Sequence, residues 1–105
     1  MDITFLKDTD NRLLLRRVTD KRTGTTITNP VSIEATVFND AGVALIGATW
    51  PLLMTAVSGT PGAFECIVPL EVPLVVNRAY RVKVRFDAGS GRRRTFSRLA
   101  QVVDG

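Results

Sequence analysis

Apolar and polar side chains alternate with a period of two along most of this chain, and no segment sustains a helical repeat. The clearest case is "RAYRVKVRF", in which Tyr80, Val82, Val84 and Phe86 are separated by basic residues. A period of two sends successive side chains to opposite faces of a strand, so one face of this segment is expected in the core and the other in water. The segment therefore predicts a half-buried β-strand.

Similar segments recur between clusters of Gly, Pro, Asn and Asp, a pattern typical of a sandwich or a barrel. We expect strands in "VSIEATV", "AFECIVP" and "RRRTFSRLAQVV", and in "VALIGATWPLLMTAV" either two short strands or one strand broken at Gly47. "LEVPLVVN" carries Pro69 and Pro73 and predicts an extended loop. A hairpin is predicted over residues 12–19 and 25–28, although "RLLLRRV" alternates poorly and a short helix is the alternative there. These segments amount to about seven strands.

Three segments resemble the core of immunoglobulin-like or fibronectin-III-like domains, namely "FNDAGVALIGATW", "GTPGAFECIVP" and "AYRVKVRFDAGSGRRRTF". The resemblance covers residues 29–103. It rests on Gly62 before the strand that holds Phe64, and on Tyr80 near the start of a strand, a position similar to the tyrosine corner of such domains. The tryptophan of antibody domains is present, but their pair of cysteines is not. The resemblance implies an all-β fold, a single immunoglobulin-like antiparallel β-sandwich of about seven strands.

The whole chain, residues 1–105, is expected to form one domain, because 45% of its residues are hydrophobic and can supply a core. Residues 1–11 are the first strand of that domain, a short helix, or an arm that adds to the sheet of a neighbouring subunit. Charged residues interrupt "MDITFLKDTD", so no signal peptide is predicted, and no apolar run approaches the ~20 residues that span a membrane. We expect a protein that stays in a cytoplasm or is assembled into a particle there, with no membrane partner.

The residue types argue against an enzyme. Histidine is absent, which excludes Ser-His and Cys-His nucleophile pairs and histidine-ligated zinc. Cys66 shares a strand face with Phe64 and Val68 and is expected to be a buried thiol. Asp8 and Asp10 offer oxygen ligands, but their segment lacks the glycine and the later glutamate of a calcium loop, so a polar turn is the better interpretation. We expect no catalytic residue, no cofactor and no bound metal.

Basic residues in the last two predicted strands are the strongest candidates for a binding site. If these strands pair, outward cations would form a patch of one sign that suits an acidic partner or a phosphate backbone. The alternative is a solvated hairpin whose charges discourage edge-to-edge aggregation. Nucleic acid is the less favoured partner, since only Phe96 is available as an exposed stacking surface. The candidate residues are Arg81, Lys83, Arg85, Arg92, Arg93, Arg94 and Arg98.

Trp50, beside Pro51, is either a core residue or an interface anchor. Small chains of this shape without a signal peptide are similar to structural proteins of tailed bacteriophages, such as head–tail, tail or decoration components. That similarity implies a non-enzymatic virion protein that binds copies of itself and other assembly subunits through sheet edges and the basic hairpin. The alternative is a monomeric bacterial adaptor that recognises an acidic protein, a glycan or a nucleic-acid surface.

Overall fold

The computed structural model describes residues 3–16, 18–19, 24, 26, 30, 32–87, 89 and 93–104. Within these residues the chain forms eight strands and no helix. The strands are β1 (Ile3–Leu6), β2 (Asn11–Leu15), β3 (Ser32–Phe38), β4 (Leu52–Leu53), β5 (Thr55–Ala56), β6 (Phe64–Val68), β7 (Ala79–Asp87) and β8 (Arg93–Val103). In the part of the chain that the structure describes, no helix is long and apolar enough to cross a membrane.

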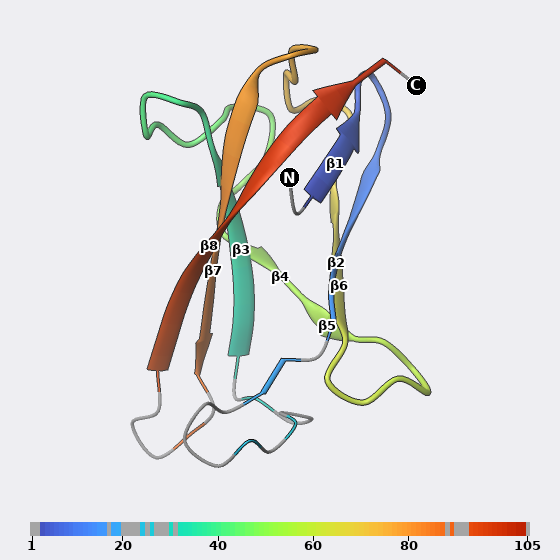
Figure 1. Ribbon diagram of the computed structural model, residues 1–105, viewed down its shortest axis with the longest axis vertical. Helices are drawn as coiled ribbons and strands as arrows, with labels where there is room; N and C mark the ends of the chain where they lie inside the picture. The colour runs from blue at the N-terminus through green and yellow to red at the C-terminus, as the bar shows by residue number, and fades with distance from the viewer. Residues whose placement is uncertain are drawn as a thin grey trace.

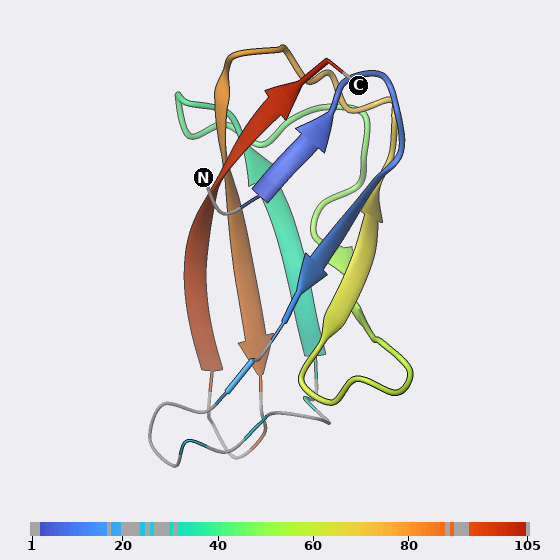
Figure 2. The same cartoon turned by 45° about the vertical axis from the view of Figure 1, so that its right-hand side comes forward.

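The strands form two sheets, with the orders β1-β8-β7-β3-β4 and β2-β6-β5. The sheets face each other, as Figures 1 and 2 show, and their inner side chains belong to one apolar cluster. All strand pairs are antiparallel except β1 with β8, which is parallel. The prediction of an all-β chain is confirmed, and the two sheets share a single core.

Alternation explains which side chains enter that core. In β7, Tyr80 and Phe86 are buried together with the two valines between them, and the intervening basic residues are exposed, as the sequence predicts. β6 buries Phe64, Cys66 and Val68 and leaves Ile67 exposed. A period of two therefore sets the inward face of each long strand.

β4 and β5 are successive parts of one bent segment that passes from the larger sheet to the smaller. β4 pairs with β3, β5 pairs with β6, and Met54 between them donates its N–H to the Ile33 carbonyl at 2.9 Å. Of the two predicted alternatives, two short strands are confirmed, whereas a strand broken at Gly47 is wrong, because the strands are separated at Met54 and Gly47 lies in the preceding loop. Gly47 serves another purpose, because its backbone approaches that of Glu71 closely.

The hairpin predicted over residues 12–19 and 25–28 is wrong for its first arm, since β2 pairs with β6 across the smaller sheet. Leu13 and Leu15 are buried there, so their alternation serves that sheet. Among the described residues, only the Thr19–Thr26 bridge joins the two predicted arms. Residues 25, 27 and 28 lie outside the described residues.

Residues 3–6 form strand β1, which pairs with β8 in the chain's own larger sheet. The turn that follows is held by side chains. Asn11 is buried and exchanges two hydrogen bonds with the backbone of Leu6, at 2.8 and 2.9 Å, and Asp10 accepts the N–H of Leu70 at 2.8 Å. The acidic segment is thus a polar turn, as the sequence favours.

Candidate functional site

The basic residues of β7 and β8 divide between two faces. The two strands pair as expected, with Arg93 opposite Asp87 and Arg94 opposite Phe86. Because consecutive residues of a strand point to opposite sides, the arginine run cannot lie on one surface. Arg81, Lys83, Arg85 and Arg93 lie on the outer face of the larger sheet and are called the outer row here. Arg94 and Arg98 lie on the opposite, core-side face, and Arg92 lies outside the described residues.

Acidic residues balance part of the outer row. Glu34 of β3 lies directly opposite Arg85, and Asp87 lies 3.7 Å from the Arg93 guanidinium. Arg81 and Lys83 have no carboxylate directly opposite them on either neighbouring strand. The outer row therefore presents a cationic centre with acidic residues at one end.

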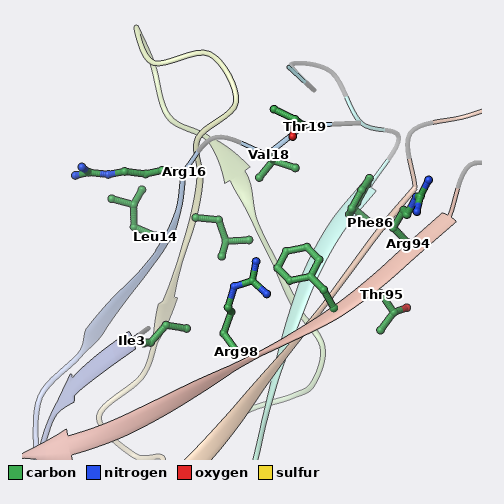
Figure 3. Close-up of a pocket in the computed structure, with 11 residues that line it drawn as sticks. Ile3, Leu14, Arg16, Val18, Thr19, Phe86, Arg94, Thr95 and Arg98 are labelled. Carbon is green, nitrogen blue, oxygen red and sulfur yellow. The ribbon is translucent and has the colours of Figure 1, made fainter. Parts of the chain in front are cut away.

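On the core side, a cleft of about 390 Å³ lies between β8 and the chain that runs from β2 to Thr19 (Figure 3). Its walls combine apolar side chains with three arginines. The apolar members are Ile3, Leu14, Leu15, Val18, Phe86 and Phe96, and the arginines are Arg16, Arg94 and Arg98. No carboxylate is among the described residues that line the cleft. The cleft is therefore apolar in its walls and positive in its charge.

Phe96 is the centre of this arrangement. Its ring packs edge-on against Phe86, with centroids 6.3 Å apart and an interplanar angle of 66°. The guanidinium of Arg98 lies over the Phe96 ring, 4.7 Å from its centroid, and donates to the Ser97 carbonyl at 3.1 Å. A cation over an aromatic face is held by the ring quadrupole, so Arg98 is fixed across the cleft (Figure 3).

The edge of β8 beside this cleft has no partner strand among the described residues. β1 covers only residues 100–103 of β8, as Figures 1 and 2 show, and leaves residues 93–99, called the open edge here. Lys7 donates to the Val103 carbonyl from the β1 side, and Asn77 donates to the Val102 carbonyl from the β7 side. Since backbone groups alternate along a strand, odd-numbered residues of the open edge turn their N–H and C=O groups away from β7.

A second exposed apolar surface lies at the other edge of the larger sheet, where edge strand β4 adjoins the smaller sheet. Leu53, on the edge strand β4, is 70% exposed, and Ile67 of β6 is 54% exposed. Both border a hollow of about 550 Å³, together with the ion pair formed by Arg12 and Glu65. Apolar side chains are therefore exposed at both edges of the larger sheet, beside β4 and beside the open edge of β8.

Trp50 lies half-buried against the core rather than free on the surface. Its indole N–H donates to the Leu45 carbonyl within the same loop. Of the two sequence alternatives for Trp50, these contacts match the core residue.

The sequence analysis does not predict that Leu14 and Arg16 line the cleft. The available signal was the poor alternation of "RLLLRRV". Leu14 is apolar where the period of two favours a polar residue, so Leu13, Leu14 and Leu15 form an apolar run that cannot all face the core.

Comparison of the chain with protein-family models, with curated protein sequences and with solved structures finds no match. The functional argument therefore starts from the open edge, the cleft and the outer row.

Proposed function

We propose that this chain is a non-enzymatic structural protein, an immunoglobulin-like sandwich that makes protein–protein contacts in an assembly such as a bacteriophage virion. Its partners are copies of itself and other assembly subunits. The virion part of the proposal rests on the similarity of size and architecture to tailed-phage components.

The strand order supports the immunoglobulin-like part of the proposal. Such sandwiches place strands G, F, C and C′ in one sheet and B, E and D in the other. Lettered in chain order, with β4 as C′, the strands here follow the orders A-G-F-C-C′ and B-E-D. The hydroxyl of Tyr80 accepts the N–H of Val75 at 2.9 Å, five residues upstream, as the tyrosine of a tyrosine corner does.

The observation that carries the assembly function is that both edges of the larger sheet are uncovered within the part of the chain that the structure describes. One end is β4 with Leu53, and the other is the open edge with its cleft. Exposed strand edges are templates for pairing with another chain. A subunit with two such ends can join two neighbours.

The outer row favours a second candidate, a monomeric adaptor for an acidic surface. Arg81 and Lys83 are exposed and have no carboxylate directly opposite. Association through such charges weakens as salt rises, whereas an apolar contact around Leu53 persists.

The deciding experiment is the solution mass by light scattering behind a sizing column, over a wide range of protein concentration and at low and high salt. Assembly predicts a discrete oligomer that survives high salt. Leu53→Glu should return it to the monomer, since the change places a charge in an apolar contact. Ser58→Glu adds the same charge at an exposed turn and should leave the mass unchanged. A monomer at every concentration would place the adaptor function first.

A further inference from the structure

The open edge and the cleft form one elongated site with a backbone side and a side-chain side. On the backbone side, Arg93, Thr95, Ser97 and Leu99 direct their N–H and C=O groups away from β7, in line with the pairing that β1 makes at residues 100–103. A strand added here would continue the sheet where β1 stops. We propose that the open edge binds an extended segment of a different protein as an added strand, and that this segment carries two acidic residues four positions apart with an apolar residue midway between them.

The spacing follows from the side chains on the core side of β8. Arg94, Phe96 and Arg98 are successive residues on this face. In an added strand, the residues opposite them also share one face, about 5 Å away from each. Carboxylates at the first and third of these positions would meet Arg94 and Arg98, which are about 13 Å apart along an extended strand. The pattern is symmetric, so it holds for a parallel or an antiparallel added strand.

The middle position requires an apolar side chain. It would face Phe96 and enter the cleft, whose far wall is formed by Leu15 and Val18. Burial of this side chain would remove its apolar surface from water and stabilise the complex. Arg16 also lines the cleft, but its side chain points away from Phe96 and Arg98 (Figure 3), so the preference for an acidic segment rests on Arg94 and Arg98.

A second copy of this chain does not fit the site. The acidic residues of the sequence are Asp2, Asp8, Asp10, Asp20, Glu34, Asp40, Glu65, Glu71, Asp87 and Asp104, and no two of them are four positions apart. The required segment therefore lies outside the residues of this sequence, and we place it in another protein. This part of the inference rests on the proposed function only in taking that protein to be an assembly subunit.

Nucleic acid fits the site less well than a strand does. Single-stranded nucleic acid is held by bases stacked on exposed aromatic faces beside cations. The two rings of the cleft are Phe86, which is buried, and Phe96, which is half-buried and packs edge-on against Phe86, so neither offers a freely exposed stacking face. The backbone groups of the open edge, which have no partner strand within the described part of the chain, by contrast match the edge of another polypeptide strand.

Arg98 also allows the site to distinguish an acidic strand from a neutral one. Its guanidinium donates to the Ser97 carbonyl, so one acceptor of the open edge is occupied in the free protein. A carboxylate on the incoming strand can draw Arg98 away and release that acceptor. A neutral strand offers Arg98 no such partner and meets a positively charged edge.

The test uses the full chain and a fluorescein-labelled peptide of nine residues, with glutamate at its third and seventh positions, valine at its fifth and threonine elsewhere. Binding is measured by fluorescence anisotropy. Replacing both glutamates by glutamine should weaken binding about tenfold, because each exposed ion pair contributes a factor of about three. A peptide with prolines at alternate positions facing β8 should not bind, since it lacks the N–H donors of an added strand.

Variants of the protein locate the peptide. Arg94→Gln and Arg98→Gln should each weaken binding about threefold, and together about tenfold. Arg78→Gln is the matched control, because Arg78 is an exposed arginine in the loop before β7 and should leave the affinity unchanged. Amide exchange supplies a second readout that does not depend on charge, in which peptide binding should protect the amides of Thr95 and Ser97.

Several outcomes would overturn the proposal. Equal affinity for the glutamate and glutamine peptides would do so, as would equal effects of Arg78→Gln and Arg98→Gln. Loss of peptide binding at protein concentrations where light scattering shows self-association would assign the site to a second copy, and displacement by a thymidine oligonucleotide would assign it to nucleic acid. If light scattering gives only monomer but the peptide binds as described, the assembly function fails and the inference stands. The reverse result keeps the assembly function and rejects the inference.

Discussion

The thiol of Cys66 lies in the core on the inner face of β6, as its alternation with Phe64 and Val68 predicts. Burial raises the pKa of this thiol to about 11, because the thiolate would lose its hydration inside the protein. At pH 8 the thiolate fraction is therefore about 100-fold lower than in the unfolded chain. We expect an aromatic disulfide reagent to label native protein at least that much more slowly than protein in urea.

The same pKa has a consequence for stability. At neutral pH the thiol is protonated in both the folded and the unfolded protein, so its raised pKa does not change the free energy of unfolding. As pH rises from about 9 to about 11, the thiolate forms in the unfolded chain but not in the folded protein, and the free energy of unfolding falls. The loss should reach on the order of 2 kcal/mol. Urea unfolding of the wild type and of Cys66→Ala at pH 8 and pH 11 isolates the effect, since the variant lacks the titrating group. An equal pH response in both proteins would contradict the burial argument.

Gly47 differs from Gly42 because its position leaves no room for a Cβ atom. Its φ is +92°, and a Cβ placed on it would come within 2.4 Å of the Glu71 carbonyl oxygen. Gly42 has φ +80° but nothing within 4 Å of the same position. We expect Gly42→Ala to cost about 1 kcal/mol through backbone strain alone, and Gly47→Ala to cost about 3 kcal/mol because the loop must also move. Urea unfolding of both variants measures the difference, and equal costs would show that the contact with Glu71 is not a constraint.

Residues differ in how far the sequence reveals their roles. The buried position of Tyr80 could be predicted because alternation and its place at the start of a strand are local features. The contact of Gly47 with Glu71 could not, since it joins two loops that are distant in sequence through backbone atoms. Hydropathy patterns describe side chains and carry no information about such a contact.

Among the elements, β8 shows how a period of two limits what a charge cluster can do. The sequence predicts the pairing of β7 with β8, and this prediction is confirmed. It also predicts that the arginine run contributes to one patch, but alternation places Arg93 and Arg94 on opposite faces of the sheet. The partner of β2 was also missed, because the alternation of Leu13 and Leu15 fits pairing with β6 as well as a local hairpin. Periodicity fixes the face of a residue but does not identify the neighbouring strand.

The open edge makes a prediction for the free protein. Even-numbered residues of β8 direct their amides toward β7, and odd-numbered residues from 93 to 99 direct theirs toward the open side. We expect the amides of Phe96 and Arg98 to exchange at least about tenfold more slowly than those of Thr95 and Ser97. Hydrogen exchange followed by NMR resolves these residues individually. Uniform protection along β8 would mean that another part of the protein covers the edge.

At the scale of the whole molecule, composition and alternation predicted the all-β class, and the arrangement of the sheets decides where the charges can act. The larger sheet separates the outer row from the arginines of the cleft. The formal net charge of +4 is therefore not available to one partner on one surface. The sequence alone could not reveal this division, since it depends on which strands border the cleft.

This division limits how strongly a polyanion can bind. The outer row offers four cations, which correspond to a slope of about −3 in a plot of log affinity against log salt concentration for single-stranded nucleic acid. We expect a thymidine oligonucleotide to bind weakly, with a slope no steeper than this value. The triple variant Arg81→Gln, Lys83→Gln, Arg85→Gln should abolish the interaction, while Arg94→Gln with Arg98→Gln should leave it nearly unchanged. A steeper slope, or equal losses from the two sets of changes, would require a polyanion to engage both faces at once, and the separation of the two basic surfaces would then be incorrect.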